Sequence, residues 1–166
     1  MFLRSDERTR RKAASMSIPM IWGLGNELRG DDAVGVWISE RLRQDPSLKG
    51  LVHTCFTVPG NYVAVLRRER PERLILVDSA DMGLPPGSVR RLPLGRTADV
   101  SFSNHDMPLE LMLASFSVSV TVIGIQPQRT DLGAPLTEAV LNSAQEVLEA
   151  LRNDDLDRFP FLEVTT

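Results

Sequence analysis

Three residues whose side chains bind metal ions or move protons stand far apart in this 166-residue chain: Asp32, Asp78 and His105. Two carboxylates and one imidazole can hold a divalent ion and still leave coordination positions open, as catalytic sites do and closed structural sites do not. A divalent ion held in this way can polarise a carbonyl group and activate water. The oxygen and nitrogen donors alone do not choose among zinc, manganese, iron, cobalt and nickel.

Each of the three residues also has an ordinary structural interpretation. Asp32 suits the first turn of a helix, where the helix dipole favours negative charge. Asp78 follows a buried strand and can hydrogen-bond its own turn, and His105 can cap or pack a helix. A shared site is favoured because all three fall at segment boundaries on the carboxyl edge of one predicted sheet, where side chains distant in sequence converge.

The elements that position these residues follow from hydrophobic periodicity and turn residues. Strands are predicted at Pro19–Gly25, Leu51–Val58, Arg73–Val77, Ser88–Leu94 and Val118–Ile125. Helical spacing of apolar residues follows in four places, with stripes at Val34–Leu42, Tyr62–Glu69, Leu109–Phe116 and Val140–Leu151, and Asp106 and Thr137 are predicted to cap the last two helices. Strands that alternate with helices predict a single-domain, three-layer α/β/α fold. Its twisted, mostly parallel five-stranded sheet carries helices on both faces, and the more polar strand Ser88–Leu94 is predicted as an antiparallel edge strand.

Composition narrows the classes of function. A net charge of −3 gives no basic field for nucleic acid, and no uncharged stretch is apolar enough to predict a membrane span. A single cysteine, Cys55, fits a reducing compartment, so we expect a cytoplasmic protein. Residues 1–17 are predicted to form a flexible basic arm, residues 18–153 the domain, and residues 154–166 a C-terminal tail. With no obvious large exposed apolar helix face, a monomer is favoured.

Other chemistries have weaker support. The loop GLGNELRGDD that begins at Gly23 has Leu28 where a dinucleotide-binding fingerprint has its third glycine, and two acids there would repel a phosphate. The serines Ser79, Ser101 and Ser103 lie outside any nucleophile-elbow motif. His53 and Cys55 share one face of a predicted strand without a nearby acidic motif, so they are interpreted as scaffold.

Four sequence blocks, taken together in this order, form a pattern specific enough to indicate a protein family. They are GLGNELRGDDAVG (Gly23 to Gly35), RLILVDSADMGLPPGSVR (Arg73 to Arg90), SNHDMPLELM (Ser103 to Met112) and IGIQP (Ile123 to Pro127). They resemble the hydrogenase maturation endopeptidase family, and within it the enzymes that serve formate-hydrogenlyase-type hydrogenases. The resemblance runs from about Ile18 to the final helix. It leaves the N-terminal arm and the segment Gln128 to Pro135 without an assigned role.

The resemblance implies an endopeptidase that removes a C-terminal extension from the large-subunit precursor of a nickel-iron hydrogenase once nickel has been inserted. It places the metal ligands at Asp32, Asp78 and His105, with nickel supplied by the precursor. Asp32 is the preferred general base, the Gly25–Asn26 backbone is expected to position the peptide, and Asp81 and Asp106 are expected to orient ligands. Two alternatives stay open: a non-catalytic chaperone or metal-loading sensor for the large subunit, and a self-contained metallohydrolase that acts on small peptides.

Overall fold

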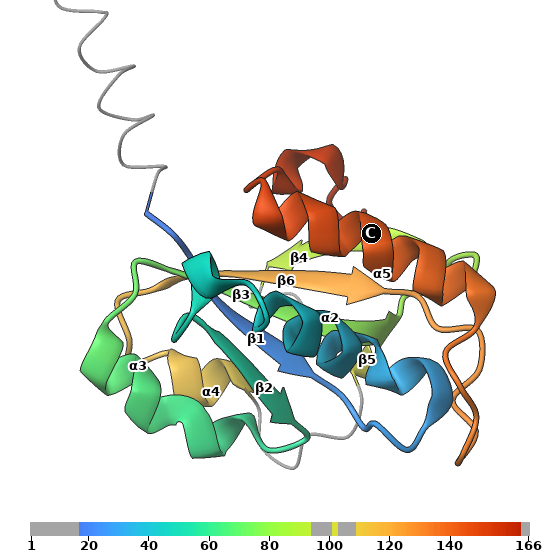
Figure 1. Cartoon of the computed structure of the whole chain (residues 1–166), viewed down its shortest axis with the longest axis horizontal. Coiled ribbons are helices and arrows are strands. Elements are labelled where there is room, and N and C mark those ends of the chain that lie inside the picture. The colour runs from blue at the N-terminus through green and yellow to red at the C-terminus, as the bar shows by residue number, and fades with distance from the viewer. Residues whose placement is uncertain (1–16, 94–100, 103–108, 164–166) are drawn as a thin grey trace, which may run out of the picture.

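The computed structural model describes residues 17–93, 101–102 and 109–163. The elements alternate as the periodicity predicts, and their bounds are β1 (Met20–Leu24), η1 (Gly30–Ala33), α2 (Val34–Leu42), η2 (Pro46–Leu48), β2 (Val52–Phe56), η3 (Pro59–Tyr62), α3 (Val63–Glu69), β3 (Arg73–Asp81), β4 (Val89–Pro93), β5 (Ser101–Phe102), α4 (Leu109–Leu113), β6 (Ser119–Ile125), α5 (Glu138–Arg152) and η5 (Leu156–Arg158) (Figure 1). Here η marks short 3₁₀ turns.

The main sheet has the strand order β2-β1-β3-β6-β4. The first four of these strands run parallel, and β4 pairs antiparallel with β6 at the edge. This confirms the predicted mostly parallel five-stranded sheet with one antiparallel edge strand. The two-residue strand β5 was not predicted; it pairs antiparallel with the end of β3 through Ala80 and Asp81. Two paired residues are too few to give a period in the sequence.

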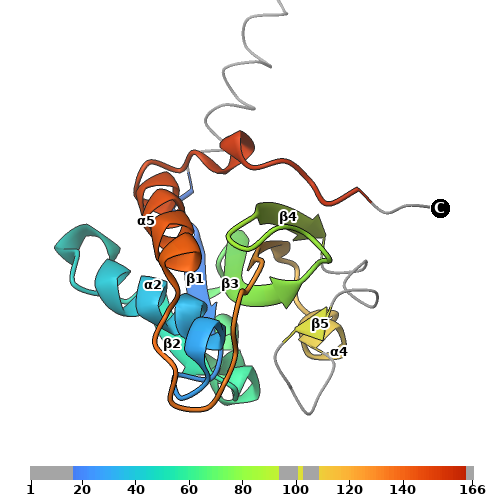
Figure 2. The same cartoon turned by 90° about the vertical axis from the view of Figure 1, so that its right-hand side faces the viewer.

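Helices cover both faces of the sheet, with α2 and α5 on one face and α3 and α4 on the other (Figures 1 and 2). Alternation along β3 supplies both cores, because Ile75 and Val77 join the cluster under α2 and α5 while Leu74 and Leu76 join the cluster under α3 and α4. Every residue of β1 is buried. The central strands therefore read as continuous apolar runs, as expected for a parallel sheet covered on both sides.

Helix α2 lies unusually close to the sheet. A β-carbon on Gly35 would collide with the carbonyl oxygens of Leu24 in β1 and Val77 in β3, and one on Gly23 would collide with Ser39 of α2. The Ser39 hydroxyl also lies 2.9 Å from that of Thr54 in β2. Since α2 is pressed against β1 and β3, the turn η1 at its start stands directly at the carboxyl edge of these strands.

The segment after α5 packs back on the domain. Leu156 and Phe159 are buried, and the guanidinium of Arg73 makes two hydrogen bonds of 2.8 Å with the carboxylate of Asp154. The backbone N–H of Arg91 in β4 donates to the carbonyl of Pro160 at 2.9 Å. The predicted domain boundaries stay predictions. No helix among the described residues has the length and apolar character needed to cross a membrane.

Two local predictions need correction. Asp78 was expected just past the third strand, but β3 continues through Asp81 because residues 78 and 79 still pair with β6 and residues 80 and 81 pair with β5. Asp31 and Asp32 were expected in the first turn of an α-helix, and they lie instead in the 3₁₀ turn η1 that precedes α2. Asp78 therefore lies within the sheet, one residue beyond the pairing of Val77 with Gly23 of β1, and Asp31 and Asp32 lie in the turn before α2.

A candidate active site at the carboxyl edge of the sheet

The carboxylate of Asp32 is held by one donor on each oxygen. The backbone N–H of Asn26 donates to Oδ2 at 2.9 Å, and the Ser79 hydroxyl donates to Oδ1 at 2.7 Å. The residue is 7% exposed. A carboxylate accepts about four hydrogen bonds or metal contacts, so both oxygens keep capacity for a further partner. Asp32 is thus oriented by the Gly25–Asn26 loop and by β3 without being saturated by them.

Asp78 lies next to the same loop. It is fully buried in β3, opposite Gly124 of β6. Alternation puts it on the face of Leu76 and Ala80, whereas its neighbour Ser79, which holds Asp32, belongs to the other face. Gly25 has a φ of +134° and lies against both residues: a β-carbon there would collide with the backbone carbonyl oxygen of Asp32 and lie 3.7 Å from Oδ1 of Asp78. A glycine is therefore required where the loop after β1 passes the Asp32 backbone and the Asp78 carboxylate.

His105, the third predicted ligand, lies outside the described residues, as do Asp106 and Ser103. Within the described ranges, no three His, Cys, Asp or Glu side chains are grouped so that they could hold a metal ion. The structure thus brings Asp32 and Asp78 to one loop, and the three-residue ligand set stays a prediction.

Asp31, the neighbour of Asp32, has a different role. Its fully buried carboxylate accepts the backbone N–H groups of Gln128 (2.8 Å) and Arg129 (2.9 Å) on Oδ2 and that of Thr137 (2.7 Å) on Oδ1. The Thr137 hydroxyl lies 3.0 and 2.9 Å from the same two oxygens. Thr137 does occupy the N-cap position of α5, but its side chain bonds Asp31 and makes no capping bond, contrary to the prediction. Asp31 is a structural residue that sequence reasoning did not separate from Asp32.

The segment Gln128 to Pro135 acquires a position through these contacts. Its backbone is tied to the loop after β1 by three further hydrogen bonds: Gly133 N–H to Leu28 carbonyl (2.7 Å), Asp31 N–H to Arg129 carbonyl (2.8 Å) and Arg29 Nε to Thr130 carbonyl (3.4 Å). Both views show the two loops side by side at the same end of the molecule (Figures 1 and 2). The two loops form one fixed rim beside Asp32.

Gln126 is a second residue that sequence reasoning missed. Its side-chain oxygen accepts the backbone N–H groups of Met82 (2.7 Å) and Leu84 (3.3 Å), and its Nε2 donates to Oδ1 of Asp81 at 3.2 Å. Asp81 is exposed, and the same oxygen accepts the N–H of Gly83. These two side chains hold the turn after β3. The IGIQP block marked Gln126, but nothing in its spacing indicated this contact.

His53 and Cys55 lie in β2 as predicted. Cys55 is fully buried, and burial raises the pKa of its thiol, which makes it a poor nucleophile. Burial lowers the pKa of His53, although its hydrogen bond with the Gly50 backbone works in the opposite direction. Its ring lies 5.8 Å from that of Tyr62. These contacts are those of scaffold residues.

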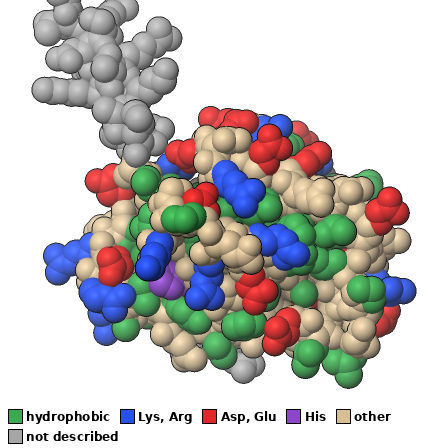
Figure 3. Space-filling view, in the orientation of Figure 1, with side chains coloured by type: hydrophobic (Ala, Val, Ile, Leu, Met, Phe, Trp, Pro, Cys, Tyr) green, Lys and Arg blue, Asp and Glu red, His purple; other side chains and the backbone are tan. Residues whose placement is uncertain are grey.

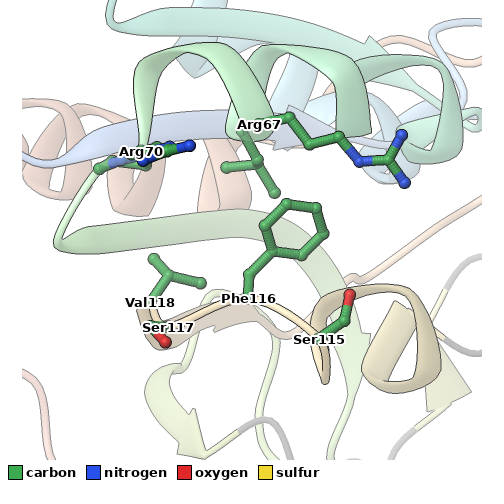
Figure 4. A pocket seen from close by; sticks show the side chains of 8 residues that line it. Arg67, Arg70, Ser115, Phe116, Ser117 and Val118 are labelled. Carbon is green, nitrogen blue, oxygen red and sulfur yellow. The ribbon is translucent and has the colours of Figure 1, made fainter.

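A cavity of about 490 Å³ lies at the opposite edge of the sheet (Figure 4). It is lined by residues at the end of α3 and before β6, which are Leu66, Arg67, Arg70, Pro71, Ser115, Phe116, Ser117 and Val118. Because β3 and β6 both begin here, residues 73–77 of β3 separate this cavity from Asp78. Its two arginines are exposed. The cavity is not part of the candidate site.

Comparisons with known proteins point to one family. The family model described as hydrogenase maturation protease matches residues 41–153, a range that contains Asp78 and His105 and begins after Asp32. The hydrogenase 3 maturation protease of Escherichia coli strain K12 is 30% identical over 132 residues, which cover 77% of this chain and 85% of that protein.

Solved structures agree with this match. The solution structure of the endopeptidase HycI from Escherichia coli superposes with a TM-score of 0.75 and 28% identity, over 89% of this chain and 98% of that one. The crystal structure of the nickel-iron hydrogenase maturation protease HycI from Thermococcus kodakarensis gives a TM-score of 0.74 and 26% identity, over 89% and 98%. The likeness extends over nearly the whole of both chains.

Proposed function

Because this chain belongs to the hydrogenase maturation protease family, we propose that it is an endopeptidase that removes the C-terminal extension from a nickel-iron hydrogenase large-subunit precursor. The observation that carries the proposal is that Asp32 and Asp78 both lie against the Gly25–Asn26 loop, at the carboxyl edge of the sheet. Parallel α/β sheets bind their ligands at this edge. The loops around it are open to a protein substrate, since Leu28 and Leu132 on them are well exposed.

In this proposal the nickel belongs to the substrate. The precursor brings an ion already inserted, and Asp32, Asp78 and His105 complete its coordination, so that only a loaded precursor is bound in register. Carboxylate and imidazole donors suit nickel among other divalent ions. Recognition of the ion then makes cleavage conditional on metal insertion.

Hydrolysis follows from the same arrangement. Water adds to the scissile carbonyl while Asp32, the preferred general base, accepts a proton from it. The tetrahedral intermediate then collapses: the C–N bond breaks, the leaving amine takes a proton, and the products are a carboxylate and an amine. The Asn26 N–H and the Ser79 hydroxyl hold the Asp32 carboxylate in one orientation, and its remaining lone pairs are left to accept the proton.

A cleavage assay tests the proposal. Purified protein is incubated with nickel-loaded and with nickel-free precursor, and the mass of the precursor is followed. We expect the loaded precursor alone to lose its extension, and Asp78→Ala to abolish the loss. Asp157→Asn is the matched acidic control, because the Asp157 side chain is 95% exposed on η5. Equal cleavage of both precursors contradicts metal gating, and full activity of Asp78→Ala contradicts the site.

The same assay separates the alternative function. A chaperone or metal-loading sensor would bind the precursor without changing its mass. We further propose that the protein works in the cytoplasm, which suits its single buried thiol, and that it is a monomer. Sedimentation equilibrium at micromolar concentration measures the oligomeric state.

A further inference from the structure

Two leucines on the fixed rim beside the candidate site are exposed to solvent. Leu28, on the loop after β1, is 62% exposed, and Leu132, on the loop before α5, is 77% exposed. In the view of Figure 3, hydrophobic side chains gather at the lower right, where these two loops lie in Figure 1. A single exposed leucine is ordinary on a protein surface. Two of them on loops that are hydrogen-bonded to each other need a separate explanation.

The two leucines are held in place. Gly133, the residue after Leu132, donates its backbone N–H to the carbonyl of Leu28 at 2.7 Å. Leu28 and Leu132 are therefore neighbours across the two loops. The buried Asp31 carboxylate fixes the start and the end of the longer loop at Gln128, Arg129 and Thr137. Loops usually lose order at their tips, and ordering them costs conformational entropy. Here the cost of ordering the loop backbones is met on folding, so a partner that binds the leucines has mainly their side chains left to order.

The position of the pair identifies the partner. Leu28 lies two residues after Asn26, whose N–H orients Asp32, and four residues before Asp32 itself. Its own N–H donates to the side chain of Asn26 at 2.9 Å, which ties it to the same loop. A protein segment bound at the Asp32 carboxylate would therefore lie next to the loop that carries Leu28.

We propose that Leu28 and Leu132 form a docking platform for an apolar segment of the precursor protein next to the bond that is cut. The platform rests on the proposed function, because the occupant is the substrate of the same site. It supplies affinity, whereas Asp32, Asp78 and His105 supply the recognition of nickel that sets the register and the chemistry. It also gives the segment Gln128 to Pro135 a role, namely to hold Leu132 in a fixed position beside Leu28.

The test compares Leu28→Ser and Leu132→Ser with Ile18→Ser. Ile18 is the matched control because it is 59% exposed and precedes β1, at the opposite end of the sheet from the candidate site. Two quantities are measured for each variant: the Kd for fluorescently labelled nickel-free precursor, and kcat and KM for the nickel-loaded precursor. A melting curve for each variant checks that the fold is retained, as expected for changes of exposed side chains.

We expect each platform variant to raise Kd and KM about tenfold, the order of effect that follows from losing one leucine contact in an interface. Their kcat should stay within about twofold of the wild type, and Ile18→Ser should change neither quantity. Unchanged Kd and KM in both leucine variants would overturn the platform. A wild-type dimer that Leu132→Ser dissociates would overturn it in favour of a second copy of this chain. If the wild type binds the precursor but cuts none, the proposed function fails, and the Kd values alone decide the platform.

Discussion

The adjacent acids Asp31 and Asp32 should respond in opposite ways to the same change, aspartate to asparagine. Both oxygens of Asp31 face backbone N–H groups, of Gln128 and Arg129 on one side and Thr137 on the other. An asparagine side chain has one oxygen and one NH₂ group, so in either orientation its NH₂ meets an N–H that needs an acceptor. Asp32 differs, because one of its two partners is the Ser79 hydroxyl, which can accept as well as donate.

The stability effect of Asp31→Asn can be estimated from these contacts. In the better orientation the amide oxygen keeps Gln128 and Arg129, but it loses the charge that strengthens both bonds, and the Thr137 N–H loses its acceptor. A hydrogen bond to a charged group contributes roughly 1.5–3 kcal/mol, and an unmade one costs about 1–3 kcal/mol. We expect a loss of about 2–4 kcal/mol in the free energy of unfolding. For a chain of this size, that lowers Tm by roughly 5–15 °C.

Asp32→Asn should leave Tm nearly unchanged, because its oxygen can face the Asn26 N–H while its NH₂ donates to the Ser79 hydroxyl. It should abolish precursor cleavage, since the proposed general base and one proposed carboxylate ligand are lost. Differential scanning calorimetry and the mass-shift assay, run on the same two preparations, measure both effects. Equal Tm values for the two variants would refute the reasoning from donors and acceptors. Cleavage by Asp32→Asn at the wild-type rate would refute the division of roles.

Three further outcomes are expected. Gly25→Ala should lose precursor cleavage, since its β-carbon collides with the Asp32 carbonyl and φ is +134°; wild-type kcat would contradict this. Protein purified without chelators or substrate should contain well under one metal ion per chain by plasma mass spectrometry, whereas a self-contained metallohydrolase would hold one. The pKa of His53 is lowered by burial, so the unfolded chain binds its proton first as pH falls. The stability that neutral His53 preserves is therefore complete above about pH 6.5 and declines below it; urea titrations of the wild type and His53→Gln at pH 7.5 and 5.5 should show a smaller decline in the variant.

Much of the fold could be predicted from the sequence because its strongest signals are periodic. Buried strands such as β1 are short apolar runs, and α5 repeats its apolar residues at helical spacing, with Val140, Ala144, Val147 and Leu151 all buried. The antiparallel edge strand was predicted from its greater polarity. The pairing of β5 with the end of β3 was beyond such reasoning, because it depends on tertiary placement of two residues.

The candidate site was less accessible to sequence reasoning. Asp31 and Asp32 have the same side chain and adjacent positions, and only the three-dimensional placement of Gln128, Arg129 and Thr137 makes one structural. Likewise, Thr137 carried the pattern of a helix cap although its hydroxyl has a better acceptor in a buried carboxylate. Hydrogen bonds between residues about a hundred positions apart leave no local spacing to detect.

The segment that follows α5 limits how an extended peptide, such as the extension of the proposed substrate, can be held. Many proteases and peptide-binding domains capture an extended chain by adding it as a strand to an open sheet edge. Here the outward backbone groups of Arg91 in β4 are already taken, its N–H by Pro160 and its carbonyl by Leu162 at 3.0 Å, and Pro93 has no N–H to offer. Strand addition at β4 is thereby disfavoured, and the same closure protects the edge from aggregation. Removing residues 156–162 should therefore make the protein more prone to aggregate through the exposed edge of β4. Affinity tags are better placed where they leave the contacts of this segment with β4 intact.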